Sequence, residues 1–328
     1  VPMIAWVNRR QIPVCIGAMT VGAVVGLLAP RSSVFLEALV APALMVLLFA
    51  TFLAVPFATI GRALKDVRFL GAVLVLNFLL VPVLVFGLSR FVTHDRALLV
   101  GVLLVLLTPC IDYVVVFTRL AGGEASRLLA ASPVLMLAQL ALLPVYLGLF
   151  AGPAILDTVE IEPFVVAFLL FIALPMGLAA VTQTAARRFR AARVVERTMD
   201  AAMVPLLALT LAVIVGAQIE TVRAHAGALL PVVPLYVVFL VVAPMLGILV
   251  ARVFRQDAAT SRATVFSGAT RNSLVVLPLA LALPEPLSLA AAAIVTQTLV
   301  ELVGMVVLVQ VVPRLVRRDA SAQFGPAP

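Results

Sequence analysis

Apolar residues fill ten long segments of this chain, and short polar stretches separate them. The segments cover residues 11–29, 36–60, 69–91, 97–119, 127–151, 162–184, 200–219, 227–251, 262–283 and 287–313. Each is about 20 residues long or longer, the length that an α-helix needs to cross the hydrocarbon core of a bilayer. The segments lack the alternation of a membrane β-barrel, and only a helix satisfies its own backbone groups within one segment. The pattern therefore predicts ten transmembrane helices.

Composition supports this interpretation and excludes other classes of protein. Hydrophobic residues make up 64% of the 328 residues and charged residues only 12%, about half the charged share of a soluble domain. Disordered chains combine low hydrophobicity with high charge, which is the opposite balance. Two cysteines exclude a disulfide framework and an all-cysteine metal site. We expect an all-α polytopic membrane protein with short loops, no cofactor and no bound metal ion.

Basic residues are distributed unevenly about the predicted segments. When the chain is threaded through the bilayer ten times, 18 of its 23 Lys and Arg residues lie on one face and four on the other. Short cytoplasmic loops carry this excess in membrane proteins, so we expect both termini in the cytoplasm and the protein in a bacterial-type inner membrane. The net charge of +8 then reflects contact with anionic lipid, and we expect no nucleic-acid partner.

Two of the segments are interrupted at corresponding places. The polar stretch 152–161 divides the chain into residues 1–151 and 152–328, and each part holds five segments, so the two repeats have opposite orientations. The fourth segment contains Thr108-Pro109-Cys110, and the ninth contains the run from Gly268 to Ser273. Interrupted helices at equivalent positions of inverted repeats mark the midplane site of many secondary transporters. We expect Pro109 and Gly268 to break the two helices.

Three ionisable residues lie well inside the segments: Asp112, Arg271 and Glu301. A charge at the bilayer centre costs roughly 2.5–3.5 kcal/mol, so these groups must pair, exchange protons or face water. Arg271 can form a salt bridge with Asp112 where the interrupted helices cross, or it can neutralise Glu301. Either pairing leaves one carboxyl as a candidate proton carrier, because burial raises the pKa of a carboxyl. A static charge cluster that fixes helix register is the alternative.

Cys110 is the candidate substrate ligand. It follows a proline that deprives the preceding turn of a hydrogen bond, and a thiol is a soft ligand that suits metalloids. Thr108, Asn272 and Ser273 lie in the same interruptions and are the other candidate contacts. Cys15, in an uninterrupted segment, is expected to be an ordinary buried side chain.

Two short runs resemble a known family. Residues 108–124, TPCIDYVVVFTRLAGGE, resemble the fourth helix of arsenite efflux permeases, whose transport-linked cysteine falls on Cys110. Residues 299–302, LVEL, resemble a motif of their last helix, whose glutamate falls on Glu301. These permeases belong to the bile acid:sodium symporter superfamily. The resemblance implies a core of helices 3–5 and 8–10, with crossed broken helices 4 and 9, beside a panel of helices 1, 2, 6 and 7.

The chain departs from both branches of that superfamily at the ninth helix. The sodium symporters have Gln-Asn-Ser where this chain has Arg271-Asn272-Ser273, and Leu274 replaces a carboxylate of the arsenite permeases. A fixed cation repels Na⁺ by several kcal/mol at a few ångströms in a medium of low dielectric constant. We therefore expect Arg271 to take the place of a bound sodium ion. The changed pair Asp112-Tyr113 and the loss of a proline at Val303 leave a different substrate open.

The resemblance implies a secondary transporter that exports arsenite, with antimonite as a second cargo, in exchange for protons, and thus a role in arsenical resistance. The alternative is an organic-anion symporter of the same fold, in which Arg271 pairs with a substrate carboxylate. The sequence contains neither H-E-x-x-H nor a Walker motif, so we expect no enzyme activity. The expected partners are the small solute, protons and membrane lipid, and association of two copies is left open.

Overall fold

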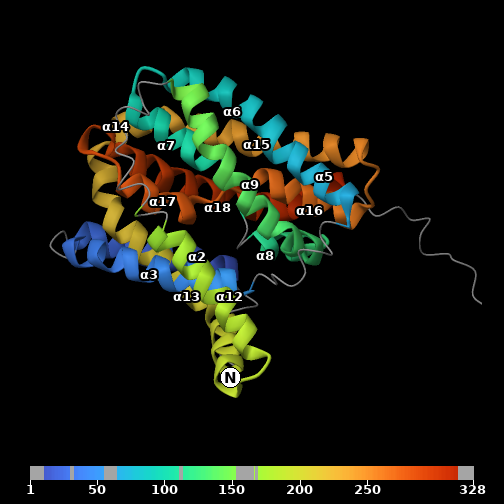
Figure 1. Ribbon diagram of the computed structural model, residues 1–328. Coiled ribbons are helices and arrows are strands. Elements are labelled where there is room, and N and C mark those ends of the chain that lie inside the picture. Colours follow the sequence, from blue (N-terminus) through green and yellow to red (C-terminus); the bar gives the residue numbers. More distant parts are fainter. Residues whose placement is uncertain are drawn as a thin grey trace, which may run out of the picture.

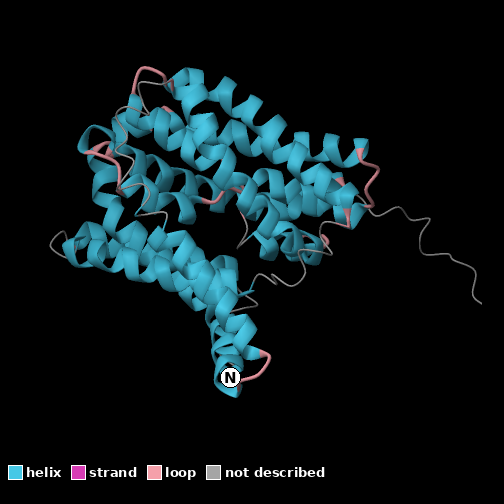
Figure 2. Cartoon of the chain, in the orientation of Figure 1, coloured by secondary structure: helices cyan, strands magenta, loops and turns pink. Residues whose placement is uncertain are grey.

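The computed structural model describes residues 11–29, 33–54, 65–110, 114–152, 166 and 169–316. Regular structure in these residues is helical (Figure 2), and a single isolated bridge joins Pro109 to Arg271. The helices of the first part are α2 (Gln11–Leu28), α3 (Ser33–Ala54), α5 (Val67–Val75), α6 (Val81–Ser89), α7 (Arg96–Leu106), α8 (Val114–Leu120) and α9 (Ala125–Ala151). Those of the second part are α12 (Leu174–Ala186), α13 (Arg190–Ala224), α14 (Ala226–Leu229), α15 (Val232–Val253), α16 (Ala258–Ala269), α17 (Ser273–Leu281) and α18 (Leu289–Leu315).

Helices occur within each of the ten predicted segments. Among the residues described, six helices are long and apolar enough to cross a membrane, and α7 and the apolar part of α2 are shorter apolar helices. The chain is therefore a multi-pass helical membrane protein, as its composition indicated. The count of ten crossings, the division at residue 151 and the inverted repeat remain predictions.

The stretch 185–199, expected to be a loop, is mostly helical. α13 begins at Arg190 and continues for 35 residues, a length of about 52 Å, whereas the hydrocarbon core is about 30 Å thick. Its first turns are rich in Ala, Arg and Glu, which favour helix as strongly as apolar residues do. Hydropathy detects only the apolar part of such a helix. For this reason the predicted start at residue 200 was wrong, and the helix begins at Arg190.

Four helices form one group in the lower half of Figure 1. α13 contacts α2, α3 and α12, and α12 also contacts α3. Glycines allow α2 and α13 to approach closely. A Cβ atom at Gly22 would lie 2.2 Å from the carbonyl oxygen of Ala212, and one at Gly26 would lie 2.3 Å from that of Gly216. Small residues that bring helix backbones together are the usual means of association in membranes.

The other helices form a second group around α7, α16 and α18, in the upper half of Figure 1. Here too a small residue permits close contact, since a Cβ atom at Gly101 of α7 would lie 2.7 Å from the carbonyl oxygen of Ala290. The residues of α7 from Ala97 to Leu106 are all buried, as are those of α16 from Thr260 to Ala269. The interrupted segments therefore lie in the interior of this group.

Candidate functional site

The two interrupted segments meet at their breaks. α7 ends at Leu106, and α16 ends at Ala269 with α17 starting at Ser273. The main chain around Pro109 lies antiparallel to that around Arg271. We call the paired residues, 107–110 and 270–272, the crossing. The breaks and the family resemblance together predicted it, and the structure brings the two breaks together.

Backbone hydrogen bonds hold the crossing. The Cys110 N–H donates to the Thr270 carbonyl at 3.1 Å, and the Asn272 N–H donates to the Thr108 carbonyl at 2.9 Å. A helix end leaves backbone groups without partners, and a buried group in that state costs about 1–3 kcal/mol. Each break therefore supplies partners that the other needs.

Side chains at the breaks end one helix and start another. The Thr108 hydroxyl donates to the carbonyls of Leu104 and Val105, at 2.9 and 3.0 Å, in the last turn of α7. The Asn272 side chain accepts from the Val275 N–H at 3.2 Å and caps the start of α17, a role that asparagine favours. Both residues were expected to contact substrate. The hydrogen bonds that the structure shows for their side chains are to the helix ends at the breaks.

Arg271 is fully buried, and its guanidinium lies at the ends of two helices. Its Nη1 donates to the Leu106 carbonyl at 3.3 Å, and its Nη2 donates to the carbonyls of Ser267 and Gly268 at 2.8 and 2.7 Å. Nη2 also donates to Asn77 Oδ1 at 2.9 Å. Leu106 closes α7, and the other two carbonyls belong to the last turn of α16, where the helix dipole is negative. The guanidinium is thus a cation held within the chain by oxygen atoms.

Asn77 is a site residue that our sequence analysis did not select. Its Nδ2 donates to the Val73 carbonyl at 2.9 Å and to Ser267 Oγ at 3.0 Å, while its Oδ1 faces Arg271. It lies in a π-helical turn, Leu76–Leu80, and such turns are frequent at functional sites. The available sequence signal was a single amide in an apolar segment, five residues before a proline.

That proline, Pro82, accounts for the π turn. Proline has no N–H, so it cannot bond the carbonyl four residues earlier, which is that of Phe78. The Tyr146 hydroxyl from α9 donates to this carbonyl at 2.5 Å instead. The wider turn lets the Val81 N–H bond the Leu76 carbonyl. Helix α9 therefore supports the turn that presents Asn77 to Arg271.

Glu301 reaches the crossing from α18. It is fully buried, and its Oε2 accepts from the Arg271 backbone N–H at 3.0 Å and from Gln297 Nε2 at 2.5 Å. The Thr270 hydroxyl contacts Met305 Sδ at 3.8 Å, one turn further along α18. Asp112, the other predicted acid, lies outside the described residues. The structure gathers six predicted site residues at or beside the crossing: Thr108, Cys110, Arg271, Asn272, Ser273 and Glu301.

Near the crossing, one polar atom in each of three buried, uncharged side chains finds no hydrogen-bond partner within the part of the chain that the structure describes. They are Asn272 Nδ2, Ser273 Oγ and Gln297 Oε1, and each side chain is at most 2% exposed. Each such atom costs about 1–3 kcal/mol unless a ligand or water binds it. Together they offer an N–H donor, a hydroxyl and a carbonyl acceptor.

Gly268 does not break its helix, contrary to our expectation. α16 continues to Ala269, and the extended residues begin at Thr270. The glycine serves close packing instead, because a Cβ atom at this position would lie 2.6 Å from Leu76 Cδ2 in the π turn. The break itself is set by the capping asparagine that follows.

Arg262 is a second buried arginine that satisfies helix ends. It opens the ninth predicted segment and is 8% exposed, and its Nε and Nη2 donate to the Val316 carbonyl at 3.0 and 2.8 Å. Its Nη1 donates to the Ala121 carbonyl at 3.1 Å. It therefore joins α16 to the ends of α8 and α18, away from the crossing.

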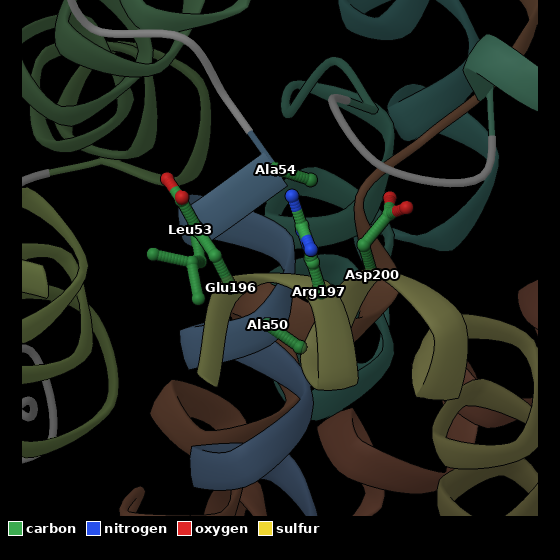
Figure 3. A pocket seen from close by; sticks show the side chains of 6 residues that line it. All are labelled: Ala50, Leu53, Ala54, Glu196, Arg197 and Asp200. Atoms are coloured by element: carbon green, nitrogen blue, oxygen red, sulfur yellow. The ribbon is translucent and has the colours of Figure 1, made fainter. Parts of the chain in front are cut away.

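A separate cavity of about 260 Å³ lies where the end of α3 meets the start of α13 (Figure 3). It shares no residue with the crossing, and it mixes small apolar with charged side chains. Its lining consists of Ala50, Leu53, Ala54, Glu196, Arg197 and Asp200. The cavity belongs to the lower helix group and not to the predicted site.

One known family matches part of the chain. The sequence profile described as the Sodium Bile acid symporter family matches residues 41–225, more than half of the chain. The match includes the fourth-segment break and ends before α16 to α18. No curated protein matches the chain. Residues 270–272, the other half of the crossing, lie outside this match, so only the structure describes them.

Proposed function

Since the chain belongs to the sodium bile acid symporter family, we propose that it is a secondary transporter that exports arsenite, with antimonite as a second cargo, in exchange for protons. Transport and membrane location follow from the family and from the apolar helices. The cargo and the coupling ion are inferred from the resemblance to arsenite permeases and from the residues at the crossing.

The observation that carries the proposed cargo is a buried thiol beside unpartnered polar groups. Cys110 is fully buried at the crossing, and a thiol can exchange with one hydroxyl of arsenous acid to form an As–S bond and water. Arsenous acid is neutral at physiological pH, and its remaining hydroxyls both donate and accept hydrogen bonds. They match the Asn272 donor and the Gln297 acceptor. A single thiol binds weakly enough to release its cargo.

The same groups disfavour the organic-anion alternative. That reading assigns Arg271 to a substrate carboxylate, yet its guanidinium is engaged by three carbonyls and by Asn77. A carboxylate would have to displace partners that cost several kcal/mol in total to leave unsatisfied. The carboxylate would also meet the side-chain oxygen of Gln297, and both groups only accept hydrogen bonds.

Arg271 supports coupling to protons and not to sodium. In transporters with broken helices, coupling cations bind at unwound backbone carbonyls and at the C-terminal ends of half-helices. Here the guanidinium occupies such a place, between the ends of α7 and α16. Glu301, bonded to Gln297 and to the Arg271 backbone, is the carboxyl that we assign to proton exchange, with Asp112 as the alternative.

Uptake of arsenite into everted membrane vesicles tests this proposal, with proton and sodium gradients imposed separately. We expect uptake that depends on the pH gradient and is indifferent to sodium. A Glu301→Gln variant should lose the response to the pH gradient, whereas Glu37→Gln, at an exposed site on α3, should keep it. Sodium-driven uptake of a carboxylated solute, without arsenite uptake, would establish the organic-anion alternative.

A further inference from the structure

The hairpin of α12 and α13 carries a dense group of exposed cations. Arg187 and Arg188 form the turn, and Arg190 and Arg193 lie in the first turn of α13; all four side chains are exposed. Phe189, at the tip, is 64% exposed. The tip of the hairpin projects beyond the other helices of the lower group (Figure 1).

Arg190 and Arg193 lie on the exposed side of α13. Their spacing of three residues places them on one face of the helix, whereas Arg197, one turn further on, lines the cavity beside α3. The opposite face, with Ala192, Glu196 and Met199, is partly buried, and Met199 packs against the hydrophobic core. Val194 lies on the arginine side and is 56% exposed. The outward face therefore combines positive charge with exposed apolar side chains.

The arginines of this face form no ion pair with the rest of the described chain. Two ion pairs occur among the described residues, Arg127 with Asp66 and Arg223 with Glu220. Neither involves the hairpin. The face also precedes the apolar part of α13, which begins near Ala201, so it belongs to the polar end of a helix that is apolar further on.

We propose that the outward face of this hairpin, formed by Arg187, Arg188, Arg190, Arg193 and Phe189, binds anionic lipid headgroups of the membrane that holds the protein. A helix face that mixes arginine with apolar residues is typical of segments that lie in the membrane interface. Arginines near an anionic surface gain affinity from its negative potential, and the apolar side chains insert at the acyl boundary. An acidic protein segment is the competing partner.

Fluorescence of the full-length protein tests the proposal. An Ala191→Cys variant places a label at an exposed position, and the natural cysteines, Cys15 and Cys110, are both buried and will react slowly. The protein carries an environment-sensitive dye and is reconstituted in phosphatidylcholine vesicles with increasing phosphatidylglycerol. We expect a blue shift that grows with the anionic lipid and is reversed by high salt.

The contribution of the arginines is measured by adding Arg190→Gln and Arg193→Gln. These changes should raise severalfold the midpoint, the phosphatidylglycerol fraction at which the blue shift is half complete, because each arginine near the surface strengthens binding roughly fivefold. The matched control is Arg252→Gln with Arg255→Gln, a pair of exposed arginines at the end of α15, which should leave the midpoint unchanged.

Three results would overturn the proposal. One is a shift of equal size in pure phosphatidylcholine, and another is a midpoint that the arginine changes leave in place. The third is a blue shift with added polyglutamate but none with phosphatidylglycerol, which would identify an acidic protein as the partner. Both variants replace exposed side chains, and equal thermal unfolding temperatures confirm that neither has lost its fold.

Discussion

Replacing Arg271 by alanine removes a cation from a fully enclosed set of oxygen atoms. Three backbone carbonyls and the Asn77 side chain lose their donor. Each buried acceptor costs about 1–3 kcal/mol, and relief of the buried charge offsets part of the sum. We expect a net loss of about 3–5 kcal/mol, the usual cost of removing one partner of a buried charged cluster, and a fall in unfolding temperature on the order of 10 °C.

The oxygen atoms left behind can accept a cation from solution. We therefore predict that sodium or low concentrations of guanidinium raise the unfolding temperature of Arg271→Ala in detergent, relative to choline, and that the wild type shows no such response. The control is Arg262→Ala, which also frees helix-end carbonyls but away from the crossing. It should be destabilised without recovering in guanidinium.

Stabilisation of the wild type by sodium would contradict this prediction, because the site would then bind sodium while the guanidinium is present. The prediction also fails if Arg271→Ala unfolds at the wild-type temperature. A sodium-dependent arsenite uptake that appears only in Arg271→Ala would extend the same conclusion from stability to transport.

Three further changes test local features. Tyr146→Phe leaves the Phe78 carbonyl without its donor and should lower stability by about 1–3 kcal/mol; an unchanged unfolding temperature would refute our account of the π turn. Gly22→Val puts a side chain against Ala212 and should separate α2 from α13, seen as reduced cross-linking between engineered cysteine pairs and a lower unfolding temperature. Burial raises the pKa of Asp257, but its bonds to the start of α16 and a nearby arginine outweigh this and hold the pKa below its ordinary value. Its stabilisation is therefore complete above about pH 4 and lost as pH falls through the folded pKa, so Asp257→Asn, which keeps the cap, should flatten that acid limb of the unfolding curve.

The sequence identified the crossing because its signals are local. Pro109 cannot continue a helix, and an arginine in an apolar segment must have partners wherever it lies. Equivalent breaks in two five-segment parts, together with the family resemblance, then indicated that the breaks would meet. Glu301 is buried beside Arg271 and accepts from its backbone N–H, whereas pairing of the guanidinium with Glu301 or with Asp112 stays a prediction.

Other features depend on contacts between distant segments, and the sequence could not predict them. Asn77 acquires its role from Ser267 and Arg271, 190 and 194 residues away. The role of Arg262 could not be predicted either, because its acceptors are carbonyls whose positions require the folded ends of α8 and α18. The extension of α13 was missed for a different reason, since helix propensity and hydropathy disagree over its first turns.

The most direct test of the account compares arsenite uptake by Cys110→Ser and Cys15→Ser in everted vesicles under a pH gradient. Both thiols are buried, and the two substitutions change the same atoms, so general damage to the protein affects both variants. The account predicts that Cys110→Ser takes up arsenite at least about tenfold more slowly, a loss of about 1.4 kcal/mol, while Cys15→Ser stays close to the wild type. Equal uptake by the two variants would contradict the assignment of Cys110 as the arsenite ligand.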